Sequence, residues 1–396
     1  MKDRGKLAIV YDCPYPFVQG GGQKRLFEIA RRLHSVGWDI HWYSLRCWDG
    51  EDTIDHSGIT YHGVGRCVRL YGEDGKRDLR EALYFGWKMA LCAELRGYDI
   101  VHAGQWPYFH IFSSRLYSAL GRGRLVVDWW EVWGRYWKEY FPGTKAVLGM
   151  LLERSAAHGA GKLVSISSKG REQLCALNVP KGRITVIPNG IDFERIQSAK
   201  KASGGADLIY MGRLKDHKNV DHLLRAVNAL SRKGLRLTVD IVGDGPERAG
   251  LEQLVDTLGM RAQVAFHGAV GSDDDVYGLM KAAKLFVHPS TKEGGGSITS
   301  LEANACGLPV VAYRHENGLS PELIQESVNG YWAEPEGWHA LADCIKAAWE
   351  AGAKAGALRE SCVRYSRDFD WDVLAGQYDT CFSELMAGPA IGECDG

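Results

Sequence analysis

Short apolar runs alternate with amphipathic stretches along much of the chain. In its second half the apolar runs are residues 207–211, 237–242, 263–267, 284–288 and 308–313. Two of the intervening stretches repeat apolar residues with a period near 3.6: Val220, Leu223, Leu224 and Val227, and Leu251, Leu254, Val255 and Leu258. Strands that alternate with helices in this way are typical of parallel sheets covered on both faces. The pattern predicts an α/β fold.

The first fifty residues follow the same order of elements. A strand over 7–11 is followed by the glycines Gly20, Gly21 and Gly22, by a helix with apolar positions at helical spacing, and by a strand over 39–44. We therefore expect two Rossmann-like domains. In such open sheets ligands bind beyond the carboxyl ends of the strands, so the loops after the strands are the places to look for function.

A segment of small and polar residues, Ser198–Ala206, separates the two series and predicts a domain boundary. We expect an N-terminal domain over 1–197 and a C-terminal domain over 198–370. The amphipathic stretch over 371–387 predicts a final helix that buries its apolar side against another surface. Residues 388–396 predict a flexible tail.

Charge is distributed unevenly. The net charge of the 396 residues is -1, but residues 1–190 hold 27 basic and 19 acidic residues, a net of +8, and the remainder has a net of -9. A basic half indicates either an anionic partner, such as a lipid surface or a phosphorylated substrate, or simply solvated faces.

The sequence also allows predictions of the protein's cellular location and of the redox state of its cysteines. No apolar run approaches the roughly 18 residues of a membrane span. The N-terminal residues lack the apolar region of a secretory signal, so we expect a cytoplasmic protein, with peripheral contact at the inner face of the membrane as a further hypothesis. In that compartment the ten cysteines are expected to be free thiols.

Three strand-end loops carry candidate chemistry. The first, QGGGQKR, places Lys24 and Arg25 at the start of a helix, where cations oppose the helix dipole unless an anion is near. A flexible loop with solvated charges is the alternative. The second, GRLKDHKN, brings Arg213, Lys215 and Lys218 just before Asn219, an expected N-cap. Fixed cations beside a helix start can bind a diphosphate.

The third segment, HPSTKEGGGSITSLEANACGLPVVAY, is the most specific. Glu293 precedes the glycines Gly294–Gly296, and a helix with Glu302 follows. The glycines free backbone N–H groups to face an anion or sugar hydroxyls, and two carboxylates can accept hydrogen bonds from a sugar and a ribose. Two solvated surface glutamates are the alternative.

Together these segments resemble the retaining glycosyltransferases of the GT-B fold, in particular the large family 4. The resemblance covers almost the whole chain. It includes GGGQKRLFEIARRL, GYDIVHA, SISSKGREQL, VIPNGID, YMGRLKDHKN, IVGDGPE, LFVHPS and EANACGLPVV.

The resemblance implies roles for individual residues. Arg213 and Lys218 would bind the donor diphosphate, Glu302 the ribose, and Glu293 the donor sugar. The donor site would also include Gly21, Gly22, Gly295, Gly296, Ser297 and Ile298. The C-terminal helix would return to the first domain, and no metal or other cofactor would be required because the two cations replace Mg²⁺.

Two features depart from the family pattern. The family's paired glutamates have seven residues between them, whereas Glu293 and Glu302 have eight, so Glu293 could be displaced. Many members also carry a histidine where this chain has VVDWWEVWGRYW. Asp128 or Trp129 falls at that position, and His102 is another strand-end candidate for the group beside the anomeric carbon.

The same segment concentrates aromatic residues from Trp129 to Phe141, which a helix would gather largely on one side. A helix packed on the core is the simplest interpretation. The alternatives are a stacking platform for an acceptor sugar, with Trp129, Trp130 and Trp106 as candidates, or an interfacial helix at an anionic lipid surface.

The sequence therefore predicts a retaining transferase that moves a hexose from a nucleoside diphosphate sugar to a hydroxyl of a glycan, lipid-linked or small-molecule acceptor. A UDP-sugar is the first choice of donor and GDP-mannose the second, and no nucleic acid is expected as a partner. A sugar-nucleotide 2-epimerase on a similar fold and a non-catalytic nucleotide-sugar-binding scaffold are the alternatives. A nicotinamide dehydrogenase fits poorly, since the glycines do not form GxGxxG.

Overall fold

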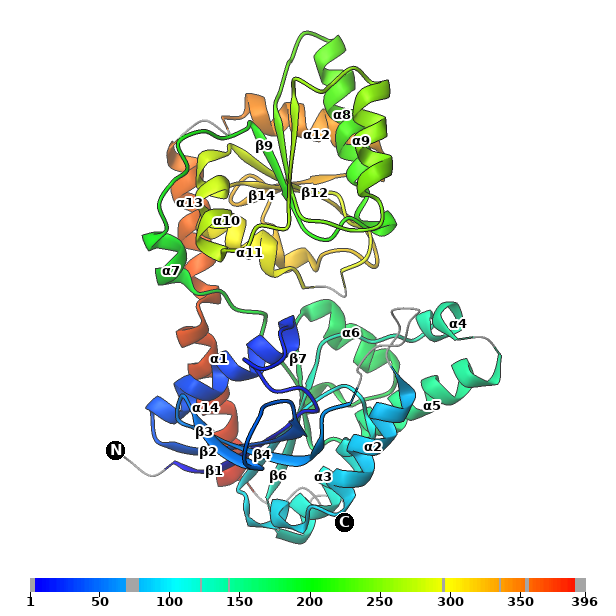
Figure 1. The fold of residues 1–396 in the computed structure, drawn as a ribbon, viewed down its shortest axis with the longest axis vertical. Coiled ribbons are helices and arrows are strands. Elements are labelled where there is room, and N and C mark those ends of the chain that lie inside the picture. Colours follow the sequence, from blue (N-terminus) through cyan, green and yellow to red (C-terminus); the bar gives the residue numbers. More distant parts are fainter. Residues whose placement is uncertain are drawn as a thin grey trace. The chain divides into compact units, whose positions relative to one another are not determined.

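The protein consists of two compact α/β units. The computed structural model describes residues 4–68, 78–121, 123–141, 143–293, 296–334, 336–352 and 356–388. Unit 1 comprises Met1–Pro188 together with Asp372–Gly396, and unit 2 comprises Asn189–Trp371. Each unit has a sheet with helices packed on it (Figure 1).

Unit 1 contains an eight-stranded sheet in the order β3-β4-β2-β1-β5-β6-β7-β8. Its strands are β1 (Gly5–Val10), β2 (Trp38–Arg46), β3 (Thr53–His56), β4 (Ile59–Arg66), β5 (Ile100–Gly104), β6 (Arg124–Trp129), β7 (Lys162–Ser165) and β8 (Ile184–Val186). Neighbouring strands are parallel except for the edge pair β3 and β4. The predicted strands over 7–11 and 39–44 correspond to β1 and β2.

Helices cover both faces of this sheet, because successive residues of a buried strand point to opposite sides. The helices are α1 (Gly21–Ser35), α2 (Leu79–Ala90), α3 (Phe109–Gly121), α4 (Tyr136–Tyr140), α5 (Thr144–Gly159), α6 (Ser168–Ala176) and α14 (Trp371–Ala387). Ala8 and Val10 share a hydrophobic core with Phe85 of α2 and Ile111 of α3. On α14, Phe382 packs edge-on against Trp38, with ring centroids 5.7 Å apart.

Unit 2 contains a six-stranded, fully parallel sheet in the order β11-β10-β9-β12-β13-β14. Its strands are β9 (Leu208–Met211), β10 (Val239–Val242), β11 (Val264–Gly268), β12 (Leu285–His288), β13 (Val310–Tyr313) and β14 (Gly330–Ala333). Its helices are α7 (Phe193–Ser198), α8 (Val220–Arg232), α9 (Arg248–Thr257), α10 (Asp273–Ala282), α11 (Ile298–Ala305), α12 (Trp338–Glu350) and α13 (Gly356–Ser366).

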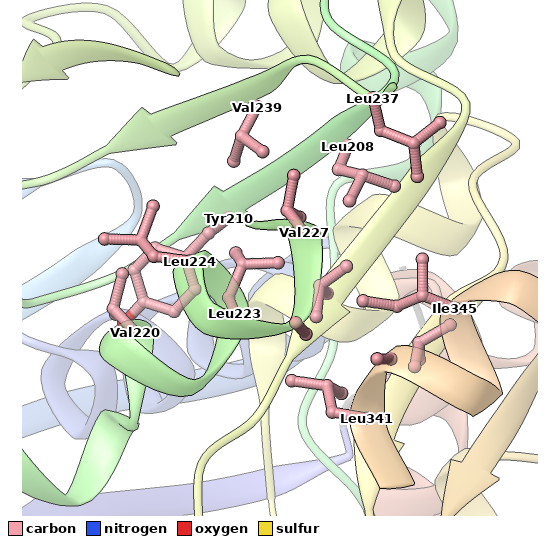
Figure 2. Close-up of a cluster of buried hydrophobic side chains, with 14 of the residues drawn as sticks. Leu208, Tyr210, Val220, Leu223, Leu224, Val227, Leu237, Val239, Leu341 and Ile345 are labelled. Atoms are coloured by element: carbon pink, nitrogen blue, oxygen red, sulfur yellow. The ribbon is translucent and has the colours of Figure 1, made fainter. Parts of the chain in front are cut away.

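Two cores lie on opposite faces of the unit 2 sheet. Leu208 and Tyr210 of β9 point into a cluster with apolar residues of α8 and α12, including Leu223 and Leu341 (Figure 2). Ile209, between them, belongs to the cluster on the other face, with residues of α7, α10 and α11. The apolar stripe predicted on α8 is thus the stripe that is buried.

The division between the units falls at Pro188, ahead of the predicted linker. Residues 189–197 belong to unit 2 because Ile191, Phe193 and Ile196 are buried in its core. The chain re-enters unit 1 at Asp372, so nearly all of α14 packs within that unit. Of the predicted tail, only residue 388 is among the described residues.

One disulfide corrects the expectation of ten free thiols. Cys47, just after β2, is bonded to Cys67, just after β4, with their Cα atoms 4.9 Å apart. These strands are neighbours in the sheet, which places the two residues side by side. Among the described residues the other cysteines are unbonded. No described helix has the length and apolar character needed to cross a membrane.

Candidate active site

The loop that follows β9, residues 212–219, carries the basic residues singled out above and is fixed by a neighbouring loop. The N–H of Leu214 donates to the carbonyl of Asp244, 2.9 Å away, in the loop after β10. Gly243 in that loop has a φ of +130°, and a Cβ there would lie 2.0 Å from the carbonyl oxygen of Gly212. Only glycine permits this close approach. The basic loop is therefore held at the carboxyl edge of the sheet.

A second loop, after β12, fixes the other side of the basic loop. The side-chain amide of Asn219 donates to the carbonyl of Pro289 (2.9 Å) and to the hydroxyl of Thr291 (3.3 Å). The N–H of Thr291 donates in turn to the carbonyl of His217. Asn219 occupies the N-cap position of α8, as predicted, but its side chain makes no capping hydrogen bond to that helix. Its side chain joins two loops instead.

This junction places Lys218 beside Glu293. The Lys218 ammonium donates to Oε1 of Glu293, and Nε2 of His288 lies 3.0 Å from the same oxygen. The side chains of Lys218 and Glu293 are 18% and 11% exposed, so the pair is largely shielded but reachable. Burial alone would raise the pKa of Glu293, but His288 and Lys218 lower it to about 2. Glu293 is therefore ionised at neutral pH.

Positive charge nevertheless exceeds negative charge here. Arg213, Lys215 and Lys218 lie on one short loop with a single acid, Asp216, and Lys292 precedes Glu293, so four cations stand against two carboxylates. Burial and then the charges of Arg213 and Lys218 lower the pKa of Lys215. Burial and then Lys218 also lower the pKa of His217. Cations that repel one another in this way can be stabilised by a bound polyanion such as a diphosphate.

Helix α11 begins beside this cluster. The hydroxyl of Ser297 accepts from the N–H of Ser300 (3.3 Å) and caps the helix, and Ile298 is its first residue. The N–H of Gly296 donates to the carbonyl of Glu293 (3.2 Å). Glu293 is paired with Lys218 despite the longer spacing between the two glutamates. Gly295 lies outside the described residues.

Glu302, one helical turn after Ser297 and Ile298, is held separately from Glu293. Its carboxylate accepts from the hydroxyl of Tyr277 on α10, at 2.9 Å, and it is 7% exposed. Burial and the charge of Glu302 raise the pKa of Tyr277, so that hydroxyl stays protonated as a donor. A carboxylate oriented in this way has lone pairs available to accept hydrogen bonds from ligand hydroxyls.

In unit 1 the glycine loop leads directly into α1. The helix begins at Gly21, and a Cβ on Gly22 would lie 2.7 Å from the indole of Trp130. The side-chain oxygen of Gln105 accepts from the N–H groups of Trp130 (2.9 Å) and of the next residue, which fixes the chain there. Gly22 and Trp130, expected at the donor and acceptor sites, are therefore in contact.

Arg25, in the first turns of α1, binds buried groups inside unit 1. Its Nε donates to Asp128 (2.9 Å), which also accepts from the hydroxyl of Tyr378 on α14 (2.6 Å) and lies 2.9 Å from Nε2 of His102. The guanidinium also donates to the carbonyl of Ile187. The positive charge at the start of α1 is thus offset by a carboxylate of the same unit.

This network changes the interpretation of Asp128 and His102. Both are completely buried, so neither side chain is exposed to a sugar. Burial alone would raise the pKa of Asp128, but His102 and Arg25 hold it well below its usual value. Their predicted place beside the anomeric carbon is not supported by this geometry. We assign them a structural role in joining α1, β5, β6 and α14.

The aromatic segment is not the helix that its composition suggested. Trp129 ends β6 and is buried, an irregular stretch follows, and α4 spans only Tyr136–Tyr140. Glu153 of α5 explains this: it accepts from the N–H groups of Trp133 (2.8 Å) and Gly134 (3.0 Å), and from the indole of Trp137 (3.1 Å). Backbone N–H groups bound to a side chain are not available to a helix.

Trp106, the third acceptor candidate, packs into this aromatic cluster. Its ring centroid lies 4.7 Å from those of Tyr108 and Trp133. A small apolar cavity of about 60 Å³ adjoins the cluster and is lined by Trp106, Trp133 and Leu79 among others. Trp129, Trp130 and Trp106 therefore do not form one flat platform: the first is buried, the second covers the glycine loop, and the third lines an apolar cavity.

Sequence reasoning missed two contributors to the site in unit 2. His288 is the last residue of β12, and its position at a strand end was a usable signal. Tyr277 had no such signal in the sequence. It lies on another helix, 25 residues before its partner Glu302, and only the fold brings the two side chains together.

Two α/β units with largely parallel sheets, the second with a basic strand-end loop beside the carboxylate of Glu293 and with the buried carboxylate of Glu302 on the following helix, define the GT-B class. Residues 192–369 match the family described as "Glycosyl transferases group 1", and residues 19–195 match the one described as "Glycosyltransferase Family 4". The chain is a glycosyltransferase of the GT-B fold.

Curated relatives agree with this assignment. An uncharacterised glycosyltransferase of Methanocaldococcus jannaschii is 27% identical over 326 residues, which cover 76% of this chain and 81% of the relative. D-inositol 3-phosphate glycosyltransferase of Mycobacterium tuberculosis is 28% identical over 251 residues, 57% of this chain. That match spans about half of the mycobacterial enzyme, 49% of its length.

Solved structures share the fold. HepE of Anabaena in complex with UDP has a TM-score of 0.71 at 20% identity, covering 96% of this chain and 100% of that one. Sucrose-phosphate synthase from Thermosynechococcus elongatus has a TM-score of 0.74 at 17% identity, covering 96% of this chain and 99% of that one. At such identities the likeness establishes architecture and not substrate.

Proposed function

We propose that this enzyme moves a hexose from a nucleoside diphosphate sugar to an acceptor hydroxyl with retention of configuration. A UDP-sugar is the preferred donor and GDP-mannose the second choice. One observation carries the proposal: Arg213, Lys215 and Lys218 gather at the carboxyl edge of the unit 2 sheet, with Lys218 bound to the carboxylate of Glu293. That arrangement suits a diphosphate with a sugar attached.

Each residue has a proposed task. Arg213 and Lys218 bind the diphosphate and offset the charge that develops on it as the sugar departs, without a metal ion. Glu302, oriented by Tyr277, accepts hydrogen bonds from the ribose hydroxyls. Glu293 and the backbone at Gly296, Ser297 and Ile298 contact the sugar and the distal phosphate. We propose the same task for the backbone of Gly295, which precedes Gly296 in the sequence.

The transfer is then a substitution at the anomeric carbon. The bond from that carbon to the diphosphate oxygen breaks, the acceptor oxygen forms a bond on the same face, and the acceptor proton passes to the departing phosphate. This scheme assigns no proton transfer to Asp128 or His102, which agrees with their complete burial.

Known proteins support the choice of donor. HepE of Anabaena, which shares the fold, is described in complexes with UDP and with UDP-glucose. For the acceptor we propose a hydroxyl of a glycan, a lipid-linked sugar or a small molecule. The excess of basic residues over 1–190 is compatible with an acceptor that carries phosphate.

Thermal unfolding with UDP, UDP-glucose, GDP and GDP-mannose tests the donor proposal first. A ligand at about 100 times its dissociation constant stabilises the folded state by roughly 2.7 kcal/mol, so the matching nucleotide should raise Tm clearly. If none of the four changes Tm, the proposed donor class is wrong.

Turnover then separates the possible reactions. Proton NMR of the preferred donor should show sugar transfer only when an acceptor mixture is present, and a product with the donor's anomeric configuration. Conversion of the donor into its 2-epimer without acceptor would identify an epimerase instead. Arg213→Ala and Lys218→Ala should each lower kcat by about 10²–10³, while Lys233→Ala, an exposed lysine at the end of α8, should not.

A further inference from the structure

Apolar side chains lie exposed in rows on three helices of unit 1. Of the fourteen large apolar residues that are exposed in the described part of the chain, ten belong to α2, α3 and α5 or immediately follow α2, and they are between 39% and 68% exposed. They are Leu79, Leu83, Trp87 and Leu91 at α2, Phe112, Leu116 and Leu120 on α3, and Val147, Leu148 and Leu151 on α5.

The spacing of these residues makes each row continuous. On α2 and α3 they recur at every fourth position, so they follow one another along one side of the helix. The other sides of the same helices are buried in the core, through Phe85, Ile111 and Ala156 among others. These helices are therefore apolar both inward and outward, which is unusual for helices at a protein surface facing water.

The three helices form one surface. Each contributes residues to the same core on one face of the unit 1 sheet, and in Figure 1 they lie on the side of that sheet away from α1 and α14. We call their outward sides the α2–α3–α5 face. Contiguous apolar areas of this kind mark sites that bind a partner or a membrane.

The exposed charges of the three helices have a single sign. All residues of the three helices are described, and their two acidic residues, Glu81 and Glu153, are each only 1% exposed. The basic residues are Arg80, Lys88, Arg115, Lys145 and Arg154, all exposed except the partly exposed Lys88. The Lys88 ammonium lies over the indole of Trp87, 5.2 Å from its centroid. The neighbouring helix α4 adds both Lys138 and Glu139 and so changes this balance little.

We propose that the α2–α3–α5 face docks on the surface of an anionic lipid bilayer. Apolar side chains with basic residues among them match the acyl boundary and the phosphates of such a surface. A second copy of the chain fits less well, because pairing this face with itself would bring two basic surfaces together. The site lies on α2, α3 and α5 and not on the aromatic segment, whose Trp129 and Trp137 are buried. It does not depend on the proposed donor or reaction.

Vesicle sedimentation tests the proposal with the full chain. Vesicles containing phosphatidylglycerol should sediment the protein at low salt, vesicles of phosphatidylcholine alone should sediment much less, and about 1 M salt should weaken binding because screening then acts over roughly 3 Å. Replacing Arg80, Lys88, Arg115 and Lys145 by Gln should lower partitioning about fivefold per residue, since each basic residue near such a surface contributes about 1 kcal/mol.

Matched substitutions separate the apolar contribution from general effects. The triple variant Leu83→Glu, Leu116→Glu and Leu148→Glu should lose at least tenfold in partitioning. The control triple Val36→Glu, Val328→Glu and Val373→Glu, at exposed apolar residues elsewhere, should bind like the parent. Circular dichroism and thermal unfolding confirm that both remain folded. Exposed basic residues outside the face, Lys200, Lys201, Arg232 and Lys233, provide the matched Gln control.

Three results would overturn the proposal. They are equal binding to neutral and anionic vesicles, equal loss in the control variants, and no binding to any vesicle. If the last occurs and sedimentation velocity shows a dimer that the Leu→Glu triple abolishes, the face belongs to a second copy of the chain.

Discussion

Two ion pairs in the protein differ in exposure, and that difference separates their roles. Arg25 and Asp128 are 1% and 0% exposed, and every oxygen of the carboxylate has partners within unit 1. Lys218 and Glu293 are partly exposed and lie among further cations. A fully satisfied buried pair stabilises one arrangement of the chain, whereas a pair with excess positive charge beside it can bind a ligand.

Asp128→Asn tests the buried pair. The substitution leaves the Arg25 charge buried without a counter-charge, which costs about 3–5 kcal/mol. We expect that loss in the free energy of unfolding from urea titration. Asp39→Asn removes an acid whose ion pair with Lys6 is more than half exposed, and it should cost less than about 1 kcal/mol. A loss in Asp128→Asn as small as that of the control would contradict the network.

The low pKa of Glu293 predicts a specific pH dependence. Because folding lowers this pKa from its ordinary value to about 2, ionised Glu293 stabilises the protein above the unfolded-state pKa of about 4.3, and the contribution is lost as pH falls toward 2. The difference in Tm between the parent and Glu293→Gln should be constant from pH 5 to 8 and shrink below about pH 4. A change between pH 5 and 8 would show that Glu293 titrates in that range.

Among the elements, strands were predicted most accurately. The apolar runs of the second half correspond to β9–β13, with ends that differ by at most two residues, because strands buried on both faces leave a clear signal. The start of helix α1 directly after the glycines was predicted equally well. The local pattern could not show that a side chain competes with helix formation for backbone N–H groups. That competition decides the conformation of the residues between Trp129 and Phe141.

Glu153→Gln tests that explanation. Glutamine replaces one acceptor oxygen by an amide donor, so N–H groups of Trp133, Gly134 or Trp137 would face another donor. We expect a loss of about 1–3 kcal/mol in the free energy of unfolding and a red shift of tryptophan fluorescence. Glu172→Gln, at an exposed position on α6, is the matched control. Unchanged fluorescence in Glu153→Gln would mean that Glu153 does not hold the aromatic segment.

At the scale of the whole molecule, the order of motifs was sufficient to predict the GT-B fold and the transferase class. The partners of individual site residues were not predictable, since they come together only through the fold. Arg25 and Tyr378 are separated by 353 residues, and Glu293 and Lys218 by 75. Asp128 and His102 illustrate the consequence: the sequence suggested strand-end positions open to a ligand, yet His102 lies in the middle of β5, and both side chains are buried in a network with Arg25 of α1 and Tyr378 of α14.

The position of the exposed apolar face could not be predicted from the sequence either. The aromatic run suggested a lipid-facing helix, but its tryptophans are mostly occupied with one another and with Glu153. Seven of the ten exposed residues of the α2–α3–α5 face are leucines, which belong to different segments of the sequence, and only the packing shows that they share a face.

The central claim is that the strand-end loops of unit 2 hold a nucleoside diphosphate, and calorimetric titration with UDP and GDP tests it most directly. The parent should bind at least one of them. Arg213→Ala, Lys218→Ala and Glu302→Ala should each weaken binding by about 1.5–3 kcal/mol, the range for hydrogen bonds to charged groups, while Lys233→Ala should not. Glu293→Ala should leave affinity nearly unchanged or raise it, since it removes a negative charge beside Lys218. Parent-like affinity in the Arg213, Lys218 and Glu302 variants, all shown to be folded, would contradict the account.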